Sequence, residues 1–119
     1  MKSYNNVTLI GRAVKTPEVK DTGSANSRAG FVLAVGRPYK DADGKRPTDF
    51  LPVVAWGKLA EICGEYISKG CLMLVSGRIQ SRSYALNAET KWITEIIAES
   101  VNILEYGKAK TEEVERKAA

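Results

Sequence analysis

The chain has 119 residues, 44% of them hydrophobic and 27% charged, and its formal net charge is +4. This size suits one domain with one hydrophobic core, and no run of residues is long and apolar enough to span a bilayer. The start of the chain lacks the apolar stretch of a signal peptide, so we expect a cytoplasmic protein.

Composition also narrows the chemistry. Histidine is absent, which removes the commonest general acid–base residue and the commonest metal ligand. Two isolated cysteines, Cys63 and Cys71, cannot form a structural zinc site and fit a reducing compartment as small buried residues. No phosphate-binding loop, nucleophile elbow or HExxH motif is present. We therefore expect no catalytic site, no metal and no cofactor.

The first half of the chain alternates strand and turn signals. Residues 7–14 are β-branched and apolar and predict a strand with a bend or bulge at Gly11. Pro17 and residues 21–24 indicate a turn. Residues 30–35 and 50–56 predict the second and third strands, with a hairpin tip at Asp43-Gly44. A proline at position 52 places that third strand at an edge or a bulge.

Residues 58–69 change to a helical period, and Gly70 follows as a candidate cap. Residues 71–84 and 91–104 predict two long strands joined by a turn at residues 86–88. Three strands, a helix and two further strands is the connectivity of an all-β, five-stranded OB-fold barrel with one helix between strands 3 and 4.

The character of the chain changes at Gly107. We expect residues 1–106 to form the OB-fold domain. Residues 107–119 have mixed charge and one large apolar residue, so they favour helix by propensity but have little to pack. They predict a short mobile tail.

The strand that contains residues 77–84 has one face suited to nucleic acid. Alternate side chains of a strand point the same way, so Arg78, Gln80, Arg82 and Tyr84 share a face. Guanidinium groups neutralise phosphates and a ring can stack on a base. The basic excess of the chain agrees with a polyanionic partner.

The third predicted strand raises the same possibility. Its inward set is Leu51, Val53 and Ala55, so Phe50 and Trp56 point outward. The two outward rings either lie under a loop or a neighbouring subunit, or they are stacking platforms. The basic face of the following strand favours stacking.

Further candidates lie near the hairpin tip and on the first strand. Tyr39 stands between Arg37 and Lys40 and either stacks on a base or folds back over the hairpin. These cations either contact phosphates or are simply solvated. Arg12 points outward from the first strand and either joins the basic surface or is a solvated arginine.

Two features of the last strand are given structural interpretations. Trp92 is expected to be packed, because tryptophan is usually well buried. Glu95 and Glu99 resemble the paired carboxylates of a hydrolase, but we interpret them as solvated strand charges.

Several stretches resemble, in order, those of the bacterial and phage single-stranded DNA-binding proteins. They are residues 6–12, 17–19, 31–35, 56–61, 65–70, 77–84 and 94–95, and together they reach across nearly the whole predicted barrel. A set of matches in the same order is far more specific than any one of them.

The resemblance implies an OB-fold that binds single-stranded DNA without strong sequence preference, in replication, recombination and repair, and that forms a homotetramer. The family's stacking aromatics match Tyr39, Phe50, Trp56 and Tyr84, although several members carry tryptophan at three of these positions and phenylalanine at that of Trp56. The resemblance also implies phosphate contacts by Arg12, Lys58, Arg78 and Arg82, to which the hairpin adds Arg37 and Lys40. Assembly would cover apolar strand surface around Leu72 and Leu74.

The tail departs from the family pattern. Typical cellular members end in an acidic tip that recruits replication and repair enzymes, whereas this sequence ends at Ala119 with mixed charge. The sequence is that of a short phage or plasmid type, a short paralogue or a trimmed chain, and recruitment through a tip is not expected.

Three rival functions are open at this stage. One is an RNA-binding or primosome-type OB-fold module. Another is a small nuclease that would use Asp41, Asp43 and Asp49, which we interpret as hairpin charges. The last is a protein-interaction barrel.

Overall fold

The computed structural model describes residues 2–20 and 26–107. Within these ranges lie β1 (Val7–Ala13), β2 (Glu18–Lys20), β3 (Arg28–Gly36), β4 (Thr48–Trp56), α1 (Gly57–Tyr66), β5 (Leu72–Leu86) and β6 (Glu89–Glu105). The predicted all-β fold with one helix is confirmed. The short strand β2 was missed, because its three exposed residues show no hydrophobic alternation and only their pairing with β3 makes them a strand.

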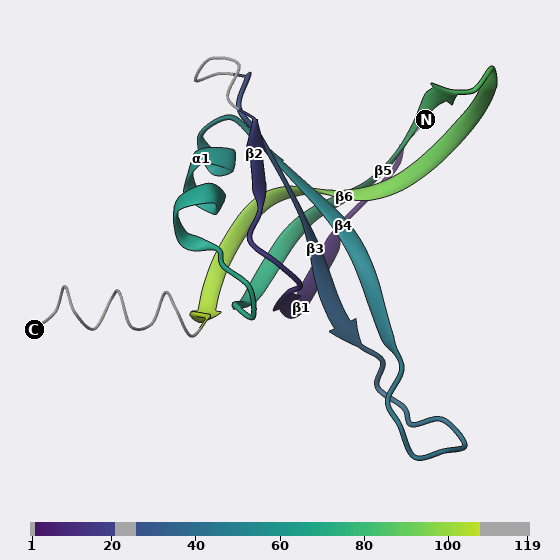
Figure 1. The fold of residues 1–119 in the computed structure, drawn as a ribbon, viewed down its shortest axis with the longest axis vertical. Coiled ribbons are helices and arrows are strands. Elements are labelled where there is room, and N and C mark those ends of the chain that lie inside the picture. The colour runs from purple at the N-terminus through teal and green to yellow at the C-terminus, as the bar shows by residue number, and fades with distance from the viewer. Residues whose placement is uncertain (1, 21–25, 108–119) are drawn as a thin grey trace, which may run out of the picture.

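Five of the strands pair in a closed ring. β1 pairs with β5 through residues 7–12 and with β3 through Arg12 and Ala13. β5 continues to β6, β6 to β4, and β4 to β3. The helix α1 lies in the connection from β4 to β5, at one end of this ring (Figure 1). This is the OB-fold topology that the order of elements predicted.

Gly11 allows β1 to pass close to β3. A Cβ at this position would lie 3.0 Å from the side chains of Leu33 and Val35 and closer still to the carbonyl oxygen of Ala34. Only a residue without a side chain permits this approach. Of the predicted bend or bulge, the bulge is absent, since the pairing of β1 shows no register shift.

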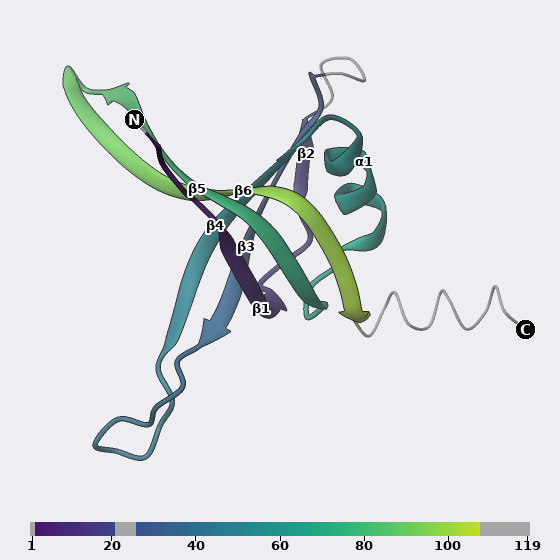
Figure 2. The ribbon, with the colours of Figure 1, turned by 180° about the vertical axis from the view of Figure 1, so that it is seen from behind.

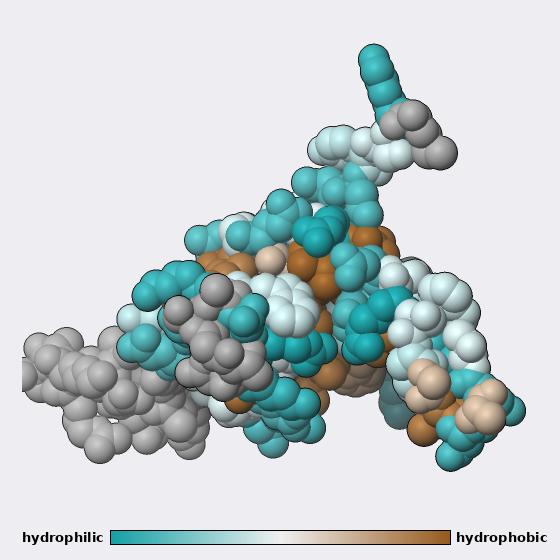
Figure 3. All heavy atoms as spheres, turned by 90° about the horizontal axis from the view of Figure 1, so that it is seen from above, coloured by the Kyte–Doolittle hydropathy of each residue, from teal (hydrophilic) through white to brown (hydrophobic). Residues whose placement is uncertain are grey.

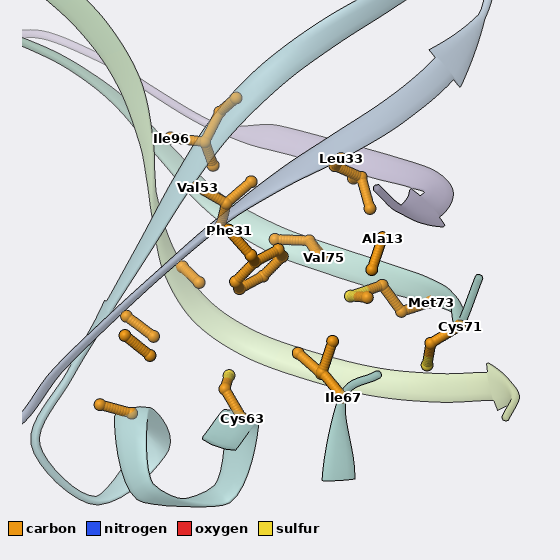
Figure 4. Packing of buried hydrophobic residues seen from close by; sticks show 14 residues of the cluster. Ala13, Phe31, Leu33, Val53, Cys63, Ile67, Cys71, Met73, Val75 and Ile96 are labelled. Carbon is orange, nitrogen blue, oxygen red and sulfur yellow. The ribbon is translucent and has the colours of Figure 1, made fainter. Parts of the chain in front are cut away.

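The hydrophobic core lies inside the ring and extends to α1 (Figure 4). The inward set predicted for β4 is confirmed, since Val53 and Ala55 are fully buried. Met73 and Val75 of β5 and Leu33 of β3 fill the centre. Cys63 of α1 is also buried, and the loss of solvent raises its pKa to about 11, so this thiol stays neutral at physiological pH.

The helix ends earlier than predicted. It stops at Tyr66, where the amide of Ile67 donates to the carbonyl of Cys63 and the Ile67 side chain enters the core. Gly70 therefore does not cap the helix. It has a φ of +86° in the turn that leads into β5, where its amide donates to the carbonyl of Ala13 at 2.9 Å.

Two hairpins extend away from the ring in different directions (Figures 1 and 2). One is the loop of residues 37–47 between β3 and β4. The other is the β5–β6 arm, which we define as residues 78–94. Asn87 and Ala88 at its tip both have positive φ, as a two-residue hairpin turn requires, and this confirms the predicted turn.

The ends of the described chain lie against the ring. The side chain of Asn5 exchanges two hydrogen bonds with the backbone of Ile79, at 2.7 and 2.9 Å. Gly107 is buried against Lys69, so the packed structure includes this residue. The rest of the predicted tail, residues 108–119, lies outside the described residues. None of the described helices is long and apolar enough to cross a membrane.

Candidate nucleic-acid interface

Strand register brings the outward aromatic and basic side chains onto one continuous surface. Val54 of β4 lies beside Ile97 of β6, and Ile97 lies opposite Arg78 of β5. Paired residues of neighbouring strands point to the same side of a sheet. Following the alternation along each strand, the exposed residues on this side include three aromatics and two arginines, which we call the aromatic–basic face: Phe50, Trp56, Tyr84, Arg78 and Arg82.

The predicted stacking residues are all open to solvent. The exposed fraction is 53% for Tyr39, 64% for Phe50, 52% for Trp56 and 43% for Tyr84. Large rings are normally among the most buried side chains, and Phe31, on the inner side of β3, is 5% exposed. In the part of the chain that the structure describes, no loop covers Phe50 or Trp56.

An ion pair at the base of the 37–47 loop orients Tyr39. The guanidinium of Arg37 donates to both carboxylate oxygens of Asp49, at 2.8 to 3.2 Å, and to the hydroxyl of Tyr39 at 2.9 Å. Hydrogen bonding to Arg37 lowers the pKa of Asp49 below its usual value of 3.8. Tyr39 is thus held at its hydroxyl, while about half of the residue remains exposed to solvent.

The carboxylate of Asp41 has structural partners in the loop. The carboxylate of Asp41 accepts from the amides of Asp43 and Lys45, at 3.0 and 2.9 Å, and so closes the tip. Gly44, with a φ of +78°, completes this turn, as the sequence predicted. Among the described residues, no three His, Cys, Asp or Glu side chains are grouped so that they could hold a metal ion.

Arg82 lies in a different environment from the one predicted. Its Nε donates to Oε1 of Glu95 at 2.8 Å, and Glu95 is only 4% exposed. The interpretation of Glu95 as a solvated charge was therefore wrong. The two residues lie on the neighbouring strands β5 and β6, diagonally across their pairing. The arginine provides the hydrogen bond that the buried carboxylate needs.

The remaining predicted cations differ in whether a carboxylate of the chain pairs with them. Lys40 and Arg78 have no carboxylate within ion-pair distance among the described residues, and the guanidinium of Arg78 approaches only Gln80, at 3.4 Å. Lys58 lies 3.8 Å from Glu61, one turn further along α1. Arg12 donates to the carbonyl of Gly70 at 2.9 Å, at the opposite end of β5 from the arm. Arg12 also lies 3.4 Å from the carboxylate of Glu105, so its charge is compensated within the chain.

Two residues of the surface were not anticipated. Arg28 of β3 lies over the ring of Trp56, with its Cζ 5.8 Å from the ring centroid. Only the register reveals that these residues are neighbours. Trp92 was expected to be packed, but it is 71% exposed on the arm and points away from the aromatic–basic face. Its place close to the predicted turn was the signal for this exposure.

The surface seen from above mixes chemical types. Hydrophilic side chains cover most of this view, and small apolar areas are exposed between them (Figure 3). A single nucleic-acid strand presents the same mixture, because its phosphates are charged and its bases are apolar on their faces. An OB-fold with exposed rings and guanidinium groups along one sheet face is the architecture of a nucleic-acid-binding protein.

Comparison with known proteins specifies the family. The model of the single-strand binding protein family matches residues 4–104, and the chain belongs to this family. The chain is 51% identical over 105 residues to single-stranded DNA-binding protein 3 of Clostridium acetobutylicum, covering 87% of this chain and 72% of the relative. It is 50% identical to the single-stranded DNA-binding protein of Clostridium tetani, with the same coverage.

A solved structure agrees with the fold. The Plasmodium falciparum SSB in complex with ssDNA superimposes with a TM-score of 0.77 at 28% sequence identity. The match covers 88% of this chain and 98% of the other. The resemblance inferred from the sequence and the OB-fold predicted from the order of elements are both confirmed.

Proposed function

We propose that this chain binds and protects single-stranded DNA, with little sequence preference and without catalysing a reaction, in replication, recombination and repair. The observation that supports this most directly is the aromatic–basic face. Its rings are exposed although rings normally favour burial, and they lie among arginines on one side of one sheet. Family membership and the names of the bacterial relatives support the same function.

The proposed mechanism combines stacking with charge neutralisation. Tyr39, Phe50, Trp56 and Tyr84 stack on unpaired bases, and base–aromatic stacking contributes about 1–3 kcal/mol per base in such proteins. Duplex DNA binds poorly, because its bases are already stacked on one another. Sequence preference is weak, since every base has an aromatic face.

We assign the phosphate contacts to cations according to whether a carboxylate of the chain already pairs with them. Lys40 and Arg78 carry charges that no described carboxylate compensates, so they are the main candidates. Arg37 and Arg82 contribute less, because each already pairs with a carboxylate. Lys58 is exposed and contributes through its mobile side chain. Each neutralised phosphate releases counterions and makes binding weaker as salt rises.

We also propose the cellular setting and the assembly. The binding takes place in the bacterial cytoplasm, and the bacterial origin of the single-stranded DNA-binding relatives supports this. The chain acts as a homotetramer, because one DNA strand that follows several such surfaces gains affinity from each of them.

A fluorescence titration tests the proposal. Oligo-dT is added to the protein at two salt concentrations, with duplex DNA and oligo-rU of equal length as controls. Quenching by oligo-dT that weakens with salt and is small with duplex is the expected result. Preference for oligo-rU would favour an RNA-binding module, and cleavage of the oligonucleotide in magnesium would favour a nuclease.

The fluorescence change in this titration must be assigned to one tryptophan. The chain has two tryptophans, and only Trp56 lies on the aromatic–basic face. Trp92→Phe leaves Trp56 as the single reporter and should keep the quenching. A gel shift on the same samples detects binding without fluorescence, and no shift at low salt would refute the proposed function.

A further inference from the structure

Arg28 and Trp56 form a cation–π pair at the end of β4. The two residues are directly opposite each other in the pairing of β3 and β4. The guanidinium carbon of Arg28 lies 5.8 Å from the centre of the Trp56 ring. This is within the range, up to about 6 Å, in which a cation is attracted to the face of an aromatic ring.

The position of the guanidinium depends on a glycine. A Cβ placed at Gly30, two residues further along the same side of β3, would lie 3.4 Å from Nη1 of Arg28. The arginine therefore extends along the surface of β3, over the space that the glycine leaves open. The side chain is half-buried, and its charge rests against the ring and the sheet.

No carboxylate among residues 2–20 and 26–107 compensates the charge of Arg28. Among the described residues, no carboxylate lies within ion-pair distance of its guanidinium, which lies over the Trp56 ring instead. Arg37 and Arg82, in contrast, both pair with carboxylates. Lys20 of β2 lies directly opposite Arg28 and is exposed, so a second cation continues the surface toward β2.

One side of Trp56 is thus occupied, while the residue as a whole remains 52% exposed. A base can stack only on a ring face that is open and held in place, because ordering a free side chain costs conformational entropy. A cation next to a stacked base is also where a backbone phosphate can be neutralised.

We propose that Arg28 is a positioning residue of the DNA-binding surface. It holds the Trp56 ring from one side so that an unpaired base stacks on the other side, and its free charge neutralises the phosphate next to that base. The inference rests on the proposed function and extends the DNA path from β4 across β3. No motif of the sequence points to this residue.

The test uses Trp92→Phe as the parent, so that Trp56 is the single fluorophore. Arg28→Gln removes the charge and keeps a polar side chain of moderate length. Arg28→Lys keeps the charge without the planar group. Lys69→Gln is the matched control, because it removes one exposed charge in the turn before β5, at the far end of α1 from Trp56.

Two readouts separate the two roles. Acrylamide quenching of the free protein measures how well the Trp56 ring is covered, without any DNA. Titration with oligo-dT at several salt concentrations then gives the affinity and the slope of log K against log salt. Circular dichroism melting confirms that each variant is folded.

Arg28→Gln should increase acrylamide quenching and weaken oligo-dT binding about five- to tenfold. It should also reduce the salt slope by about 0.7, the change expected for one phosphate contact on a single strand. Arg28→Lys should keep the slope but not the full protection of the ring, and Lys69→Gln should leave both readouts at the parent values.

Parent-like quenching and affinity in Arg28→Gln would overturn the inference while leaving the proposed function intact. If the parent itself does not bind oligo-dT, the proposed function fails and so does the phosphate contact. The acrylamide measurement would still decide separately whether Arg28 holds the ring.

Discussion

At the scale of single residues, the arginines of the interface differ by their partners rather than by their exposure. Arg78 has no carboxylate partner among the described residues, whereas Arg82 donates to the buried Glu95. A buried carboxylate without a partner is costly. Arg82 is therefore a residue of the fold as well as a candidate for phosphate contact.

This arrangement predicts the stability of an Arg82 variant. Arg82→Ala should lower the free energy of unfolding by about 1–3 kcal/mol, because it leaves Glu95 buried and unpaired. Combining it with Glu95→Gln should recover most of the loss, since the charge is then removed. Urea unfolding measures both. Lys91→Ala is the control, because it breaks only the exposed pair with Glu89, and its effect should be below about 1 kcal/mol.

A double variant that unfolds as easily as Arg82→Ala alone would contradict this account. It would mean that the aliphatic part of the arginine, and not its charge, stabilises the arm.

The pair of Arg37 and Asp49 gives a pH prediction. The native pKa of Asp49 is below 3.8, so the pair stabilises the folded loop above about pH 3.8 and is lost as pH falls through the native pKa. Carbon-detected NMR titration should show this low value. Arg37→Gln should raise it toward 3.8, whereas Tyr39→Phe, which keeps the ion pair, should change it much less. An unchanged pKa in Arg37→Gln would contradict the assignment.

At the scale of elements, the β5–β6 arm is a ribbon of two strands beyond the ring (Figure 1). Isolated hairpins of this kind are only marginally stable, so the junction with the ring determines its direction. Gly77 lies at that junction, next to a shift of register in the pairing of β5 with β6. A Cβ there would overlap the backbone carbonyl of Ile97.

Gly77→Ala should therefore destabilise the protein by about 1–3 kcal/mol, because a rigid backbone group and not a side-chain end must move. Thermal melting with the change in melting temperature is the measurement. Gly36→Ala is the matched control within a strand, since its Cβ would meet only the flexible side chain of Arg46, at 3.4 Å. Equal melting temperatures for the two variants would show that the junction is adaptable.

At the scale of the whole molecule, apolar residues remain on the outside of the ring. Ile10 of β1 lies opposite Leu74 of β5 on the outer side, and Ile10 is exposed. A monomer gains little from such a surface, whereas a second copy can cover it. The proposed homotetramer gives these residues a role.

Light scattering tests the assembly. The unsubstituted protein should show about four times the mass of the 13.0 kDa chain. Ile10→Lys should reduce that mass, because a lysine charge cannot be buried in an apolar contact without a partner. Ile62→Lys, on the exposed side of α1, should leave the mass unchanged. A monomeric unsubstituted protein would refute the tetramer. An intact tetramer of the Ile10→Lys variant would show that the contact between subunits lies elsewhere.

Much of the fold could be predicted because it depends on local patterns. The alternation on β4 separated Val53 and Ala55 from Phe50 and Trp56 in the chain itself, and the helical period of residues 58–69 located α1. The outward direction predicted for Phe50, Trp56 and Tyr84 follows from the same alternation, since side chains of a strand have a period of two. Tyr39 lies in a loop and was singled out by the cations on either side of it. Their contact with DNA stays a prediction.

Only the tertiary structure decided which residues of different strands become neighbours. The pairing of Arg82 with a buried Glu95 and the position of Arg28 over Trp56 both depend on the register between strands. The sequence determines which side of a strand a residue occupies, because the backbone alternates locally. The residue that lies opposite it on the adjacent strand is determined by the packing of the whole ring, which no local pattern encodes.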